Sequence, residues 1–94
     1  MTNENKSQIQ ISDNIAGAEY TNAMQIRHNK DEFQMIFMNL MPPSGRVVSK
    51  IVSTPGHMKR ILEAMKDNLK KYEDQFGAID EAEAPSGLGF NSDK

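Results

Sequence analysis

Polar and apolar residues alternate in two short segments of the N-terminal third of the chain. Residues 8–12 are Gln-Ile-Gln-Ile-Ser, and a similar alternation returns over residues 19–28. A period of two residues is typical of a strand that buries one face, so both segments are expected to be strands. The tripeptide Asn29-Lys30-Asp31 then predicts a hairpin turn, because Asn and Asp tolerate left-handed backbone angles and hydrogen-bond to nearby backbone.

The segment from Glu32 to Met41 is the most hydrophobic part of the chain. Apolar side chains occupy both of its faces, which predicts a strand that is dry on both sides. One face carries Phe33, Met35 and Phe37, and the other carries Ile36, Met38 and Leu40.

A further strand is expected over residues 46–53, after a break at residues 42–45 that contains two prolines and a glycine. This segment is rich in β-branched residues, which favour strands. Strict alternation places Val47 and Ile51 on one face and Val48 and Val52 on the other.

A single amphipathic helix is expected to follow this strand and to end at Gly77. Thr54 is suited to the N-cap, and Pro55 to the first helical position, where its missing amide donor costs nothing. Gly77 is suited to a helix end in the left-handed conformation. Between these limits the apolar residues form one continuous stripe at helical spacing: Met58, Ile61, Leu62, Met65, Leu69, Tyr72 and Phe76.

These elements predict an α+β fold: an antiparallel meander of three to four strands, followed by one amphipathic helix packed on one face. One helix covers only one face of such a sheet, so the second face needs another cover. We expect an identical subunit to supply it in a two-fold arrangement, which gives a homodimer. The residues expected at this partner or oligomer face are Ile36, Met38, Leu40, Val48 and Val52.

The 94 residues are expected to hold a single α+β domain at residues 8–79. Residues 1–7 are polar without periodicity, and residues 80–94 are rich in acidic and small residues, so a disordered N-terminus and a disordered acidic tail are expected. The core of such a domain is small, and no cysteine is present to support it with a disulfide. The polar start of the chain, the lack of cysteine and the lack of a long apolar run predict a cytoplasmic protein that spans no membrane.

The chemistry of the sequence points away from catalysis. His28 and His57 are the candidates for proton transfer, but the sequence places no nucleophile or carboxylate beside either, and their spacing is not that of metal ligands. Adjacent carboxylates fall at predicted turns or in polar ends, where nothing desolvates them, and the glycines form no phosphate-binding loop. We therefore expect no enzyme, no cofactor and no metal.

Charge is distributed unevenly, and this raises the possibility of nucleic-acid binding. Residues 46–71 carry seven cations and two anions, whereas six anions and one cation follow from residue 73 onward. Lys59, Lys66 and Lys70 lie along one side of the predicted helix and are candidates for binding a polyanion. Glu63 lies at pairing distance between them, and aromatic residues that would stack on bases are few, so nucleic-acid binding is the less favoured alternative.

Seven methionines occur in the chain, and methionine adapts its shape to irregular apolar partners. Met35, Met58 and Met65 are expected to fill a core. For Met38 and Met41, at the uncovered face or the strand end, a core role and a role in hydrophobic recognition both stay open.

Several short motifs occur in order over residues 8–79: Ile9-Gln10-Ile11, Gly17 through Asn22, Asp31-Glu32-Phe33, Arg46-Val47-Val48, Thr54 through Leu62 and Asn68 through Gly77. In this combination the chain resembles a family of short prokaryotic proteins that is catalogued as domain of unknown function 3467. The resemblance supports the domain limits and carries over no catalytic or binding residue.

The expected topology, a meander followed by a helix, also looks like that of the SecB-type export chaperones, which is an analogy of fold alone. It implies a mechanism in which apolar sheet surface holds an extended client. The leading interpretation is therefore a small, non-enzymatic, homo-oligomeric protein that binds another polypeptide through hydrophobic sheet surface. Weak nucleic-acid or polyanion binding by the basic helix face is the alternative.

Overall fold

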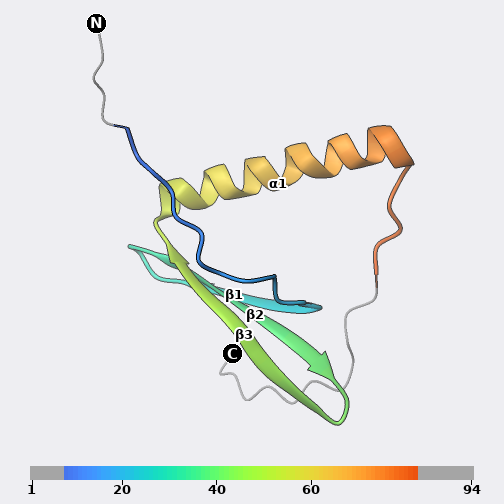
Figure 1. The fold of residues 1–94 in the computed structure, drawn as a ribbon, viewed down its shortest axis with the longest axis horizontal. Helices are drawn as coiled ribbons and strands as arrows, with labels where there is room; N and C mark the ends of the chain where they lie inside the picture. Colours follow the sequence, from blue (N-terminus) through green and yellow to red (C-terminus); the bar gives the residue numbers. More distant parts are fainter. Residues whose placement is uncertain (1–7, 83–94) are drawn as a thin grey trace, which may run out of the picture.

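Residues 8–82 are described by the structure, which is a computed structural model. Three strands, β1 (Ala23–His28), β2 (Phe33–Met41) and β3 (Ser44–Ser53), form one antiparallel sheet in the order β1-β2-β3. The helix α1 (Pro55–Phe76) follows β3 (Figure 1). The predicted α+β class, a meander followed by one helix, is confirmed. The predicted disordered N-terminus and all of the acidic tail beyond residue 82 lie outside the described residues.

The turn between β1 and β2 forms as its residues predict. The side-chain oxygen Oδ1 of Asn29 accepts hydrogen bonds from the backbone N–H groups of Asp31 and Glu32, at 2.8 and 3.0 Å. The backbone N–H of Asn29 also donates to the carbonyl of Glu32 at 3.0 Å. Asn29 thus satisfies backbone donors inside the turn and fixes the pairing of His28 with Phe33.

The hairpin between β2 and β3 is tighter than the sequence predicts. Pro42 and Pro43 connect the strands through a cis peptide bond, and β3 begins at Ser44, which pairs with Met41. Gly45 pairs with Leu40 at a close approach: a Cβ on Gly45 would lie 2.5 Å from Leu40 Cδ2. A side chain at position 45 would require Leu40 to shift, and glycine lets β3 start here, two positions before the expected strand, without that shift.

A β-bulge changes which residues of β3 share a face. The pairing steps from Phe37 with Ser49 to Met38 with Val47, so Val48 is an extra residue without a partner on β2. Directly opposed residues of a sheet point to the same face, so Val47 lies on the Met38 face rather than on the Ile51 face. The alternation expected along this strand is wrong at Val47 for that reason.

The strand expected at residues 8–12 does not form. These residues have no regular secondary structure, and Ile9 and Ile11 are 86% and 89% exposed. Two isoleucines bury too little apolar area to offset the ordering of an isolated strand, and the segment pairs with neither edge of the sheet. The meander therefore has three strands.

Residues just before β1 bond to β2 through side chains as well as through one backbone hydrogen bond, from the N–H of Asn22 to the carbonyl of Met38 at 3.1 Å. Asn22 Oδ1 accepts the backbone N–H of Leu40 at 2.9 Å, and Asn22 Nδ2 donates to the Leu40 carbonyl at 3.0 Å. The hydroxyl of Thr21 donates to the carbonyl of Met38 at 2.8 Å. These bonds explain why regular pairing begins at Ala23, later than the alternation from residue 19 indicates.

The limits of α1 agree with the predicted capping residues. Thr54 has an extended backbone, and its hydroxyl accepts the N–H of His57 at 3.2 Å, while Pro55 occupies the first turn. At the other end Gly77 adopts a φ of 99°, and its N–H donates to the carbonyl of Glu73 at 2.9 Å. Thr54 and Gly77 therefore set the length of the helix.

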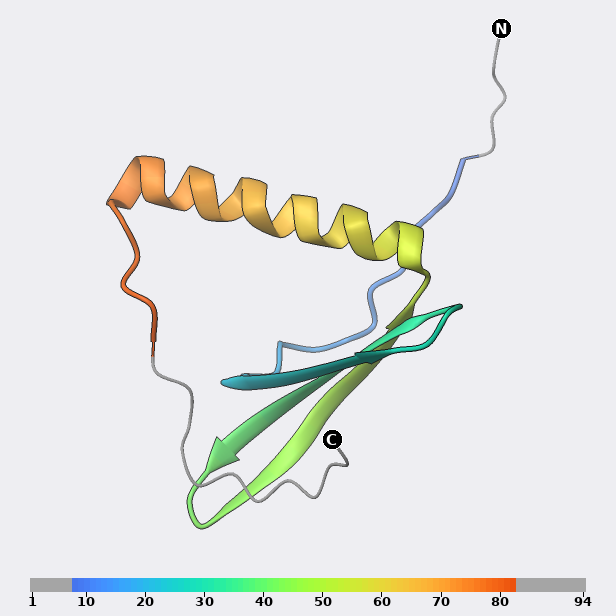
Figure 2. The same cartoon turned by 180° about the vertical axis from the view of Figure 1, so that it is seen from behind.

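The expected packing of α1 on the sheet is realised only at its first two turns. Met58 and Ile61 are half-buried, and every other residue of the helix is exposed. The helix leaves the sheet directly after Ser53, and its C-terminal end lies far from the strands (Figures 1 and 2). The core within residues 8–82 accordingly consists of three buried apolar side chains from β2: Met35, Ile36 and Met38.

Candidate functional site

The largest exposed apolar surface of the described chain follows one side of α1. We call it the α1 stripe and define it as Met58, Ile61, Leu62, Met65, Leu69, Tyr72 and Phe76. Beyond Ile61 its members remain between 49% and 65% exposed. The rings of Tyr72 and Phe76 contact each other with centroids 4.9 Å apart. An apolar stripe of this length that the other described residues leave exposed is a candidate interaction surface.

A second apolar surface lies on the sheet, around the buried Met35. Met35 pairs with Ile26 on β1 and with Ile51 on β3, so these three side chains share a face. Ile26 and Ile51 are 45% and 44% exposed, and Met24, further along β1, is 50% exposed. We call Met24, Ile26 and Ile51 the sheet patch.

The residues predicted for the partner or oligomer face occupy different environments. Ile36 and Met38 are buried within the chain itself, at 6% and 4% exposure. Leu40 and Val48 are half-buried, and Val52 is 54% exposed. The middle of that face is thus inaccessible to a partner. Its exposed apolar area lies on β3, at Val52 and at Val47, which the bulge brings to the same face as Val52.

The three cations predicted for polyanion binding all lie on α1, and one of them is paired. Lys70 Nζ lies 3.0 Å from Asp74 Oδ2, one helical turn away, in an exposed ion pair. Lys59 and Lys66 are exposed. Glu63, which is predicted to pair with these lysines, forms no ion pair with them among the described residues. The anion that pairs with Lys70 is Asp74.

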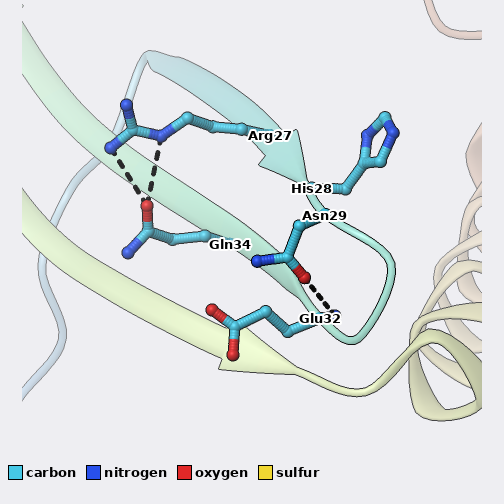
Figure 3. A pocket seen from close by; sticks show the side chains of 5 residues that line it. All are labelled: Arg27, His28, Asn29, Glu32 and Gln34. Carbon is cyan, nitrogen blue, oxygen red and sulfur yellow. Dashed lines mark hydrogen bonds between the residues drawn. The ribbon is translucent and has the colours of Figure 1, made fainter.

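A polar hollow of about 150 Å³ lies at the β1–β2 turn (Figure 3). Arg27 donates from Nε and Nη2 to Oε1 of Gln34, at 3.2 and 3.0 Å. The ring of His28 contacts Phe33, with centroids 5.4 Å apart, and points away from the carboxylate of Glu32. This hollow does not combine a base and an acid aimed at one point, so it favours neither proton transfer nor nucleophilic catalysis.

His57 contacts an arginine rather than a carboxylate or a nucleophile. Its Nδ1 lies 2.8 Å from Nη2 of Arg60, one turn further along α1, and both side chains are exposed. Within residues 8–82 no polar or charged side chain is buried, and no group of three or more His, Asp or Glu is placed to hold a metal ion. The structure therefore places neither His28 nor His57 in a shielded site.

A second, larger hollow, of about 220 Å³, lies at the opposite end of the sheet between Asn39, Met41 and Arg46. Asn39 Oδ1 is shielded there and has no hydrogen-bond partner in the described residues. Arg46 is held by Glu19, with Nη2 2.8 Å from Oε1. A single shielded oxygen does not define a ligand, and the ion pair instead ties the segment before β1 to β3.

The family motifs prove to hold structural contacts. Glu19, Thr21 and Asn22 belong to one motif, and each forms a bond with β2 or β3. Sequence reasoning did not single out these residues, because a bond between a side chain and a distant backbone group leaves no periodic signal. The sequence indicates these contacts only through the occurrence of the three polar residues together just before a strand.

The comparison with known families agrees with this set of motifs. A family model described as a protein of unknown function (DUF3467) matches residues 1–81. The chain belongs to this family. The resemblance predicted from the motifs is confirmed, and the match to DUF3467 includes the whole sheet and all of α1.

No curated protein and no solved structure matches this DUF3467 chain. Residues 8–82 contain no helix that is long and apolar enough to cross a membrane.

Proposed function

We propose that this protein is a non-enzymatic, homo-oligomeric protein that binds another polypeptide through the hydrophobic surface of its sheet. The observation that carries the proposal is the exposure of large apolar side chains on well-formed strands. Met24, Ile26 and Ile51 are each 44–50% exposed around the buried Met35. Apolar side chains that converge on one face and stay accessible are typical of recognition surfaces.

An extended segment is the form of client that fits this surface. β1 and β3 are the edges of the sheet within the described residues, so each presents backbone groups that another strand can pair with. Strand addition at such an edge supplies affinity through backbone hydrogen bonds and lets alternate side chains reach an adjacent apolar patch. Met24 on β1 adds a side chain that adapts to different client residues.

Catalysis is the less favoured class because the titratable side chains of residues 8–82 are all exposed. A general acid or base usually needs a site that shields it from bulk water. Binding requires only the apolar surface and open strand edges described above. Polyanion binding is separated from apolar binding by salt, since phosphate contacts weaken steeply as salt is added and apolar contacts do not.

The substitution Ile51→Asp tests the sheet patch directly. It places a charge among Met24, Ile26 and Met35 without removing a buried side chain, because Ile51 is 44% exposed. We expect the affinity for a fluorescein-labelled, extended peptide rich in leucine and valine to fall by about tenfold or more, measured by fluorescence anisotropy, because desolvated apolar contact is lost.

Val52→Asp is the matched control, since Val52 is the next residue of β3, is 54% exposed and lies on the other face. Equal loss of affinity in both variants would count against the sheet patch. Affinity that vanishes on adding salt, in the native chain, would count against polypeptide binding and favour the polyanion alternative.

A further inference from the structure

We propose that α1 pairs antiparallel with α1 of a second copy of this chain, and that Lys59 of each copy faces Glu73 of the other. The inference rests on the self-association in the proposed function and assigns it to a particular surface. That surface is the α1 stripe, which is half-exposed along most of its length. The second copy is the occupant because the stripe is complementary to itself in spacing and in charge.

The spacing of the stripe is that of a coiled-coil seam. Six of its residues are separated by alternating steps of four and three, which keeps them on one line of the helix. They are Met58, Leu62, Met65, Leu69, Tyr72 and Phe76. Ile61 lies beside this line and widens it at the end nearest the sheet.

One antiparallel register brings all six seam residues into contact. Met58 then meets Phe76 of the second copy, Leu62 meets Tyr72, and Met65 meets Leu69, with each contact repeated by the two-fold axis. In the first two of these contacts an aromatic side chain meets a smaller aliphatic one, as interdigitating layers require. Sliding by one heptad in either direction leaves two seam residues of each copy without a partner.

The charges beside the seam distinguish this register from a parallel pair. In it Lys59 faces Glu73 of the second copy at two symmetric places, and Lys66 faces its own counterpart once. Two attractive contacts therefore stand against one repulsive contact. A parallel pair would place Lys66 beside Ile61 and Glu73 beside Asn68, which gives no ion pair.

The accessible area of the stripe is sufficient for a specific contact. Burying the exposed halves of five large apolar side chains from each copy, together with the accessible part of Met58, removes on the order of 1000 Å² in total, which reaches the lower end for specific interfaces. The far side of α1 carries Arg60, Glu63 and Lys71, all exposed, so it offers no comparable surface.

Charge reversal tests the predicted neighbours. We expect Lys59→Glu to raise the dimer dissociation constant by about tenfold, measured by sedimentation or light scattering over a dilution series, because two attractive contacts become repulsive. The double variant Lys59→Glu/Glu73→Lys is expected to restore most of the affinity. Lys71→Glu, on the far side of α1, is the matched control and is expected to leave it unchanged. Glu73→Lys also removes the bond that Glu73 Oε2 accepts from the N–H of Ile79, so the effect of this single variant on the dimer dissociation constant is measured as well. Failure of the double variant to recover any affinity relative to the single variants would overturn the pairing.

Cross-linking decides the direction of the helices, and the absence of cysteine makes each introduced thiol unique. With a short thiol-specific linker, a mixture of Lys59→Cys and Glu73→Cys chains is expected to link efficiently, whereas Lys59→Cys alone is not. Asn68→Cys is expected to link to itself, because residue 68 lies near the two-fold axis. Efficient self-linking of Lys59→Cys would overturn the antiparallel arrangement.

The outcomes separate this proposal from the proposed function. A dimer that is indifferent to α1 substitutions but is lost in Ile51→Asp would overturn the helix pairing and leave self-association standing. A chain that stays monomeric at all concentrations would overturn both the pairing and the homo-oligomeric part of the function. Peptide binding by the sheet patch is measured independently in each case.

Discussion

At the scale of single residues, Asn22 shows how a side chain can take the place of backbone. Its amide offers one acceptor and one donor, and both bond to the peptide groups of Leu40, at 2.9 and 3.0 Å. The arrangement copies the exchange of two hydrogen bonds in an antiparallel ladder. Asn22 therefore anchors the incoming chain to β2 one residue before β1 begins.

We expect Asn22→Ala to lower the free energy of unfolding by about 1–2 kcal/mol, because two hydrogen bonds to backbone are lost at a partly exposed site. The measurement is the midpoint of urea denaturation at constant slope. Asn14→Ala, in an exposed and irregular segment, is the control. An unchanged midpoint in Asn22→Ala would mean that water replaces these bonds without cost.

At the scale of elements, α1 depends on its capping residues more than a packed helix would. Only Met58 and Ile61, in its first two turns, are half-buried, so little tertiary packing supports it. Isolated helices in water are marginally stable, and their ends fray. Thr54 accepts the N–H of His57 at 3.2 Å and so satisfies one of the free donors of the first turn.

Thr54→Ala is expected to destabilise the chain by about 1 kcal/mol and to reduce the helical signal in far-ultraviolet circular dichroism. The reason is the loss of the acceptor for His57. Thr54→Ser keeps that hydroxyl and is expected to behave like the native chain. If the alanine and serine variants lose equal helicity, the cap is not what holds the first turn.

The strands show where sequence patterns stop being sufficient. The hairpin turn at Asn29 and the helix limits at Thr54 and Gly77 follow from local chemistry, because each acts on backbone groups within four residues. The bulge at Val48 depends on how β3 meets β2, so alternation alone misplaced Val47. The same limit explains residues 8–12, whose alternation is that of a strand but which pair with neither edge of the sheet.

At the scale of the whole molecule, the described chain keeps two apolar surfaces accessible at once. The sheet patch is 44–50% exposed, and the α1 stripe beyond Ile61 is 49–65% exposed. The core of three buried side chains within residues 8–82 is small, and the chain has no cysteine to support it with a disulfide. The proposed association would bury further apolar surface.

We therefore expect the thermal unfolding temperature to rise with protein concentration, because a dimer that dissociates on unfolding is stabilised by mass action. Scanning calorimetry over a hundredfold range of concentration measures this. Lys71→Glu is expected to follow the same trend, since it lies away from the stripe. A transition temperature that does not change with protein concentration would indicate that the folded chain is a monomer.

What the amino-acid sequence determined by itself is the set of elements, their order and most of their limits, because these depend on local backbone chemistry and on the period of apolar residues. Thr54, Pro55 and Gly77 delimit α1, and the family motifs identify DUF3467, in both cases without reference to distant contacts. The tertiary structure decided which apolar residues are buried. Ile36 and Met38 are buried, whereas Leu62, Leu69 and Ile51 remain exposed to solvent. The reason is that burial depends on which elements pack together, and α1 packs on the sheet only at its first two turns.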